Sequence, residues 1–366
     1  MAVHNYFLLA LTVLLAAFLV VSAKRTPIKK IWLKRLVNIF SVAAIVIMVL
    51  TVVLFPNFSS VKTTGEYAYT SHRVEFDTNR VETFATDGST RKLSVLVYYP
   101  NPGEAEAGKC PLVVFSHGGI SFDTGNLSLY KELASHGYIV AGISHTYHAI
   151  NTRIGGKSVF IDSNYMRRLS TENSHTDIQN SYALFQELMN IRTSDINDVI
   201  DLMIEKSAAE TDLFYPLIDT ENIGVAGHSL GGSAAIGAAR QRDDIKAVIV
   251  LEAPYMLDII GINGNEFVWN TEPYSCAIMN IYSDSGYPLV ESDNKYTQNR
   301  NYLYNNERVE YYYIEGSNHY SLTDLVRTSP ILCALLGGGY KNGYGTLAFI
   351  NEKSAAFFDK HLGHSF

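Results

Sequence analysis

The apolar positions of the chain form two patterns, one confined to the first sixty residues and one that repeats through the rest. Residues 6–23 and 36–55 are long runs dominated by Leu, Val, Ala and Ile, and Asn38 is the main interruption of the second run. From about residue 90 onward, short apolar runs alternate with helix-like stretches. The first pattern is typical of membrane-spanning helices, and the second is typical of strands that alternate with helices.

Short runs of β-branched and aromatic residues predict the strands of the second region. The run at 92–99 alternates between apolar and polar positions, whereas the later runs do not, as is typical of strands buried on both faces of a parallel sheet. These later runs lie at residues 112–115, 138–143, 223–226, 247–251, 277–282 and 309–314, with helical patterns at 127–135, 177–206 and 346–361. We therefore predict an α/β fold, a mainly parallel sheet flanked by helices, over residues 85–366. Residues 61–84 are polar and patternless, and we expect them to be a linker.

Each of the two N-terminal apolar runs is long enough to cross a bilayer core as a helix. The connection between them, residues 24–35, carries all six Lys and Arg residues of the first sixty, among which Asp and Glu are absent. Basic loops stay in the cytoplasm, so we expect a transmembrane helical hairpin with spans at about 6–23 and 36–55 and the rest of the chain outside the cytoplasm. The alternative is a cleaved signal peptide followed by one anchor, but residues 1–5 lack the basic charge that precedes such a peptide's apolar run.

Composition and charge narrow the classes of function. Apolar residues make up 47% of the chain and charged residues 18%, which favours a large folded core over disorder. With the six basic residues of the N-terminal region set aside, 23 basic and 36 acidic residues remain, a net charge of −13 that repels nucleic acids. Phosphate-binding glycine motifs are absent from the sequence, and we expect neither a metal nor an organic cofactor. We expect Cys110, Cys276 and Cys333 to be buried thiols, with one disulfide as the alternative.

One motif of the sequence carries nucleophilic chemistry. Gly227, Ser229 and Gly231 form a G-x-S-x-G pattern between the run at 223–226 and a helix of small residues. The tight strand-to-helix turn requires glycine at both flanking positions, and it lifts the serine hydroxyl above the sheet, where the helix N-terminus favours negative charge. We therefore expect Ser229 to be the nucleophile of a serine hydrolase with an α/β-hydrolase fold. The alternative is a glycine-rich turn that contains a serine by chance.

A serine nucleophile needs a base, and the base needs a carboxylate to orient it. His319 follows the last predicted strand, where the base of this fold lies, and the other histidines lack that combination of position and chain order. Two carboxylates compete for the third role, because Glu252 follows the run at 247–251 and Asp284 follows the run at 277–282. The pattern alone favours Asp284, since the acid most often follows the later strand.

Acyl transfer also needs backbone N–H groups aimed at the developing oxyanion. One should be the amide of Leu230, directly after the nucleophile, and the other should come from the loop after the run at 112–115. That loop, Ser-His-Gly-Gly-Ile at 116–120, contains two adjacent glycines that let the backbone approach a substrate closely. We expect the second donor to be the amide of Gly119, and the alternative is a plain glycine turn.

Beyond these motifs, the chain resembles the secreted and intracellular platelet-activating-factor acetylhydrolase family over about residues 85–330. The resemblance rests on Phe-Ser-His-Gly at 115–118, Leu-Ala-Ser-His-Gly-Tyr-Ile-Val at 133–140, Ile-Gly-Val-Ala-Gly-His-Ser-Leu-Gly-Gly at 223–232 and Glu-Gly-Ser-Asn-His at 315–319. In that family the acid is an Asp between Leu and Ala, which matches Leu251-Glu252-Ala253 here, so the resemblance implies Glu252 as the acid. Polyester hydrolases and cutinase-like esterases share the serine turn and place the acid at the position of Asp284.

These features predict a membrane-anchored serine esterase, of the lipase or acetylhydrolase type, whose catalytic domain lies outside the cytoplasm. We expect it to cleave short-acyl or lipid esters through an acyl-enzyme, with Ser229, His319 and Glu252 as the triad and Gly119 and Leu230 as oxyanion donors. One alternative is a polyester or cutinase-like esterase, or an acyltransferase, on the same fold. The other is a non-catalytic, membrane-tethered binding module that keeps the fold.

Overall fold

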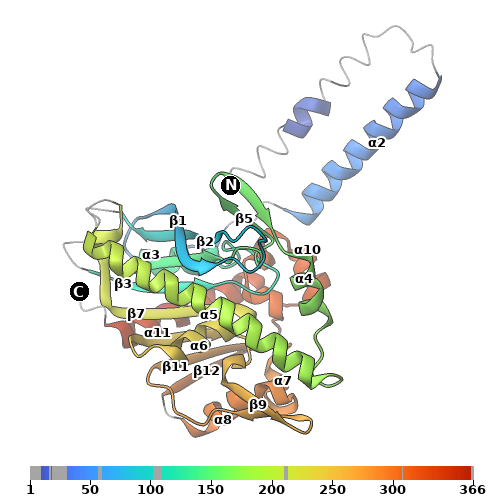
Figure 1. The fold of residues 1–366 in the computed structure, drawn as a ribbon. Helices are drawn as coiled ribbons and strands as arrows, with labels where there is room; N and C mark the ends of the chain where they lie inside the picture. Colours follow the sequence, from blue (N-terminus) through green and yellow to red (C-terminus); the bar gives the residue numbers. More distant parts are fainter. Residues whose placement is uncertain are drawn as a thin grey trace.

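A computed structural model describes residues 10–15, 18, 31–56, 60–101, 109–209, 213–306 and 308–363. Its centre is an eight-stranded sheet, with helices on both faces (Figure 1). In spatial order the strands are β1 (Tyr69–Val81), β2 (Thr90–Pro100), β4 (Ile139–Ser144), β3 (Cys110–Ser116), β7 (Ile218–His228), β8 (Ile245–Leu251), β11 (Ala277–Ser283) and β12 (Val309–Ile314). β1 pairs antiparallel with β2 and β2 antiparallel with β4, and every later pair is parallel.

The central strands are apolar on both faces because helices cover both sides of the sheet. In β3, Leu112 and Val114 pack into the core cluster that contains α5 (Ile178–Ala209) and α6 (Leu230–Gln241). Val113 and Phe115, one position along, pack into the opposite cluster with α3 (Leu127–Ser135) and α11 (Gly343–Leu362). Successive side chains of a strand point to opposite faces, so both faces of a strand between two helical layers are buried and apolar.

Shorter elements surround this three-layer core. They are the hairpins β5 (Asn151–Ile154) with β6 (Lys157–Phe160) and β9 (Ile259–Asn263) with β10 (Glu266–Trp269), the helices α4 (Ser163–Thr171), α7 (Tyr287–Ser292), α8 (Thr297–Asn305), α9 (Leu325–Thr328) and α10 (Pro330–Gly337), and the 3₁₀ turns η1 (Tyr215–Leu217), η2 (Met256–Asp258), η3 (Asn294–Tyr296) and η4 (His319–Leu322).

The predicted α/β fold with a mainly parallel sheet is confirmed. The strand at 309–314 and the helix at 127–135 have the predicted bounds, and the stretch 177–206 is a single helix, α5. The predicted linker at 61–84 is wrong, because β1 lies within it and pairs with β2 along most of its length. β1 is an edge strand, and its alternation of exposed polar residues with buried Phe76 and Thr78 was hidden by the polar majority.

The predicted hairpin of two membrane-spanning helices is not supported. Among the described residues, the one helix long and apolar enough to cross a membrane is α2 (Ile31–Leu54), and none of its most apolar window is buried (Figure 1). It starts five residues before the predicted span at 36–55, because Lys34 and Arg35 are helical rather than part of a connecting loop. The predicted span at 6–23 lies mostly outside the described residues, of which 10–15 are helical.

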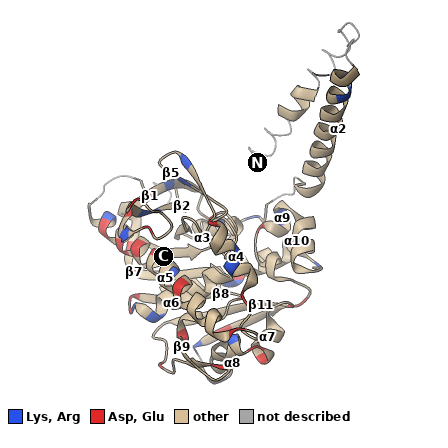
Figure 2. Cartoon of the chain, turned by 45° about the vertical axis from the view of Figure 1, so that its right-hand side comes forward, with Lys and Arg blue, Asp and Glu red and all other residues tan. Residues whose placement is uncertain are grey.

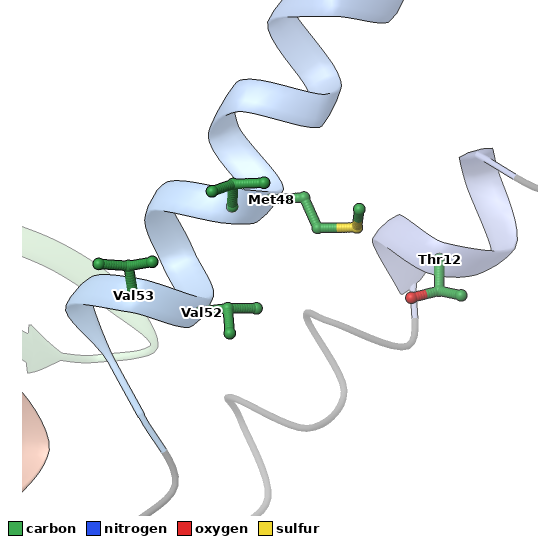
Figure 3. A pocket seen from close by; sticks show the side chains of 5 residues that line it. Thr12, Met48, Val52 and Val53 are labelled. Carbon is green, nitrogen blue, oxygen red and sulfur yellow. The ribbon is translucent and has the colours of Figure 1, made fainter.

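A shallow apolar cavity of about 350 Å³ lies between residues 10–15 and α2. Thr12, Met48, Val49, Val52 and Val53 line it, and Figure 3 shows Met48 pointing toward the helical stretch that carries Thr12. The lining contains no ionisable side chain, so this cavity has no acid–base chemistry of its own.

Candidate active site

Ser229 occupies the sharp turn between β7 and α6. Its backbone has φ 53° and ψ −129°, a conformation that is strained for a residue with a side chain, and its N–H donates to the Leu251 carbonyl at 2.9 Å. A Cβ at Gly227 would overlap the carbonyl of Gly231, and a Cβ at Gly231 would overlap that of Ser116. The two flanking positions therefore need glycine for steric reasons, as the motif requires.

His319 and Glu252 form a hydrogen-bonded pair beside this turn. The imidazole Nδ1 lies 2.7 Å from Glu252 Oε1, and Glu252 Oε2 accepts the backbone N–H of Ser283 at 2.5 Å. Glu252 is 2% exposed in its side chain, whereas His319 is 28% exposed. Both carboxylate oxygens are thus held, and the pair orients the ring with Nε2 as the nitrogen left for proton transfer.

Glu252 reaches His319 through a gap that Gly286 leaves open. Glu252 itself has a positive φ of 51°, and its N–H donates to the Ile281 carbonyl at 2.9 Å. A Cβ at Gly286 would overlap the carboxyl group of Glu252. No local pattern in the sequence indicates the role of Gly286, because that role depends on a side chain 34 positions away.

The rival carboxylate, Asp284, holds a different part of the structure. Its Oδ1 accepts the hydroxyl of Tyr313 at 2.6 Å, and both of its oxygens lie 3.1 Å from the N–H of Gly316. Its own N–H donates to the carbonyl of Ser317 at 3.2 Å. Asp284 thus stabilises the loop that leads to His319, while Glu252 contacts the imidazole.

His228 links the serine turn to the histidine loop. Its Nε2 lies 3.0 Å from the carbonyl oxygen of His319, and the two ring centroids are 4.5 Å apart. Burial is the main cause that holds the pKa of His228 well below its usual range, so the neutral ring donates to that carbonyl. In the described part of the chain no hydrogen bond joins Ser229 to His319, and such contacts tighten when substrate binds.

The glycine loop after β3 lies against the serine turn. A Cβ at Gly118 would lie 3.6 Å from Cβ of Ser229 and 3.3 Å from Nδ1 of His228. Leu230 is the first residue of α6, and within the described ranges neither its N–H nor that of Gly119 has a backbone acceptor. The two amides expected to bind the oxyanion are therefore on adjacent segments and available.

A hydrogen-bonded chain of serine, histidine and aspartate also lies deeper in the fold. Ser116 Oγ is 2.8 Å from Nε2 of His145, whose Nδ1 is 2.8 Å from Asp195. All three side chains are completely buried, and Asp195 also pairs with the guanidinium of Arg91 at 2.7 Å. Burial lowers the pKa of His145 to about 3, so this imidazole does not accept a proton near neutral pH. The arrangement braces the core and is closed to substrate.

The described residues contain no cluster of three or more His, Cys, Asp or Glu side chains that could hold a metal ion. Cys110, Cys276 and Cys333 are free and buried, as expected, and burial raises the pKa of each thiol to about 11. At neutral pH these thiols are protonated and inert, which leaves Ser229 as the nucleophile candidate that the turn exposes.

Comparison with known proteins gives the relatives of the chain. The chain is 27% identical over 278 residues to a platelet-activating factor acetylhydrolase of Canis lupus familiaris and 28% identical over 279 residues to that of Bos taurus. Each alignment covers 70% of this chain and 58% of the relative, so the chain spans less than two thirds of the length of these relatives.

Among solved structures, a ferulic acid esterase from Streptomyces cinnamoneus shares the fold, with a TM-score of 0.59 and 19% identity over 83% of this chain and 93% of that one. Residues 90–366, well over half of the chain, match the family described as platelet-activating factor acetylhydrolase, isoform II. The chain therefore belongs to the platelet-activating factor acetylhydrolase isoform II family.

Proposed function

We propose that this protein is a membrane-anchored serine esterase that cleaves carboxylic esters through an acyl-enzyme. The observation that carries the proposal is the 2.7 Å contact between Glu252 and His319 beside the strained turn that presents Ser229. A buried carboxylate, a partly exposed imidazole and a serine hydroxyl in this order are the components of acyl transfer.

Each residue has a defined step in the proposed reaction. Ser229 Oγ attacks the ester carbonyl while His319 Nε2 takes its proton, and Glu252 stabilises the imidazolium that forms. The N–H groups of Gly119 and Leu230 bind the oxyanion of the tetrahedral intermediate. The intermediate expels the alcohol, which receives its proton from His319, and water then hydrolyses the acyl-enzyme by the same route.

Apolar side chains beside the glycine loop support an acyl or lipid ester as substrate. Ile120 and Phe122 lie one and three positions after Gly119 and are 43% and 42% exposed. A side chain at Gly119 would overlap Leu169 of α4, so apolar groups approach the loop from that side as well. The names of the relatives, acetylhydrolases of platelet-activating factor, support an acetyl ester as one such substrate.

The membrane topology that we propose has one span, α2, with the catalytic domain outside the cytoplasm. On α2, the basic residues lie near the end of the helix that is farther from the sheet (Figure 2). The remaining basic residues of the region, at 24–30, precede that end in the chain. Basic flanks stay in the cytoplasm, so the residues after α2 would emerge on the opposite side.

The test uses the full chain in detergent and p-nitrophenyl esters from acetate to octanoate. We expect turnover by the native chain and a loss of turnover in Ser229→Ala. The rates for the different acyl lengths, compared in the native chain, define the substrate class. Equal rates in the two proteins would show that the activity does not depend on this serine and would overturn the proposed function.

A further inference from the structure

Arg192 of α5 is a buried cation whose hydrogen bonds converge on the oxyanion loop. Its guanidinium is fully buried and, within the described residues, makes no ion pair with a carboxylate. Nη1 donates to the carbonyl of His117 at 2.9 Å, and Nη2 lies 3.4 Å from that of Gly118. Nε donates to Nδ1 of His148 at 3.1 Å.

Tyr165 of α4 holds the third carbonyl of the same loop. Its hydroxyl donates to the Gly119 carbonyl at 2.7 Å and accepts from Arg192 Nη2 at 3.3 Å. Its ring stacks on His148, with centroids 4.0 Å apart and an interplanar angle of 6°. Arg192 and Tyr165 therefore hold the carbonyls of three consecutive residues, two of them glycines.

Because the peptide unit is planar, the direction of a carbonyl fixes the direction of the N–H group in the same unit. The carbonyl of Gly118 and the N–H of Gly119 belong to one trans peptide and point in opposite directions. The Gly118 carbonyl lies 3.4 Å from Arg192 Nη2 and 2.7 Å from Nδ1 of its neighbour His117, and these contacts direct the Gly119 N–H away from α5. Tyr165 holds the next peptide unit through the Gly119 carbonyl, so both peptide planes that flank Gly119 are fixed. Without such contacts, two adjacent glycines could rotate that N–H out of the site at little energetic cost.

Burying a cation without a carboxylate partner is costly, and burial lowers the pKa of Arg192. Each of its three nitrogens donates to a carbonyl, hydroxyl or imidazole acceptor, and two of these acceptors are backbone atoms of the oxyanion loop. An apolar side chain would pack the same interior at lower cost. A contribution to the reaction, from the fixed direction of the loop carbonyls and from the positive charge behind them, would offset the cost of burying this cation.

We infer that Arg192 and Tyr165 are positioning residues that orient the Gly119 amide of the oxyanion hole. This inference rests on the proposed esterase function. The Gly119 N–H binds charge only in the transition state. Loss of the contacts that Arg192 and Tyr165 make with the loop should therefore lower kcat and leave KM nearly unchanged. A purely structural role would lower stability and the number of folded sites, but not kcat per folded site.

The experiment compares Tyr165→Phe with Tyr138→Phe in the full chain in detergent. Tyr138 is also buried and donates a hydrogen bond, at 2.6 Å to Asp359, but it packs in the core cluster on the opposite face of the sheet. Exhaustive labelling with a fluorophosphonate counts the folded active sites, so kcat for p-nitrophenyl acetate is expressed per labelled site. Arg192→Lys, which keeps the charge and loses the planar fork, is measured in the same way.

We expect kcat per site to fall by about tenfold to a hundredfold in Tyr165→Phe and Arg192→Lys, with KM little changed, and to stay at the native value in Tyr138→Phe. Native kcat per site in Tyr165→Phe would overturn the inference alone. Activity that is the same in the native chain and in Ser229→Ala would overturn the proposed function, and this inference with it.

Discussion

The side chain of Glu252 is one methylene longer than that of an aspartate, and its surroundings show how the extra length is accommodated. The positive φ of Glu252 turns its side chain back toward the sheet edge, and Gly286 leaves the space that its carboxyl group fills. The N–H of Ser283 then binds one oxygen, and His319 binds the other. These contacts distinguish Glu252 from Asp284, whose carboxylate is occupied by Tyr313 and Gly316.

The first prediction separates these two carboxylates. We expect Glu252→Gln to lower kcat by about 10⁴-fold, because a neutral amide neither stabilises the imidazolium nor selects the correct ring tautomer. Asp284→Asn should change kcat far less, because it perturbs a loop contact and leaves the imidazole's partner in place. Steady-state kinetics on a p-nitrophenyl ester measure both variants, and a larger loss in Asp284→Asn would assign the acid to that residue.

At the scale of elements, the sequence pattern predicts those strands and helices whose signals lie within a few consecutive residues. The strand at 309–314 and the helix at 127–135 were predicted with the observed bounds, since short apolar runs and helical periodicity are local signals. β1 lacks such a signal because polar residues are the majority along it, even on the face that contains buried Phe76 and Thr78. Likewise, nothing local to Arg192 or Tyr165 reveals contacts with a loop that lies 46 to 75 positions earlier in the chain.

The second prediction tests whether β1 is part of the folded domain. Phe76 of β1 is 3% exposed and belongs to the main core cluster, so Phe76→Ala should lower the free energy of unfolding by about 3–5 kcal/mol. Val81, at the end of the same strand, is 64% exposed, and Val81→Ala should cost no more than about 0.5 kcal/mol. Urea unfolding of the detergent-solubilised chain measures both, and equal stabilities would contradict the placement of β1 in the sheet.

At the scale of the whole molecule, the site rests on a core that contains four buried, neutral histidines. Burial is the main cause that holds the pKa values of His117, His148 and His228 well below their usual range and lowers that of His145 to about 3. The unfolded chain binds protons at these positions below about pH 6.5, whereas the folded chain does not. The stability that they provide is therefore complete above pH 6.5 and is lost as the pH falls from 6.5 toward 3.

The third prediction follows from this linkage. The free energy of unfolding should fall below pH 6.5 with a slope of about 1.4 kcal/mol per pH unit for each buried histidine. His228→Gln should make the slope shallower by about one such contribution, and His72→Gln, at an exposed position, is the matched control. Unfolding measured between pH 7.5 and 5.5 tests this, and a flat profile in the native chain would contradict the neutral, buried state of these rings.

The central claim is that Ser229, and not the buried Ser116, forms the covalent intermediate. The most direct measurement is peptide mapping by mass spectrometry after reaction of the full chain with a fluorophosphonate or, under acid quench, with p-nitrophenyl acetate. We predict one adduct, on the peptide that contains Ser229, and none in Ser229→Ala. An adduct on another residue, or an unlabelled Ser229 in a chain that still hydrolyses the ester, would contradict the account.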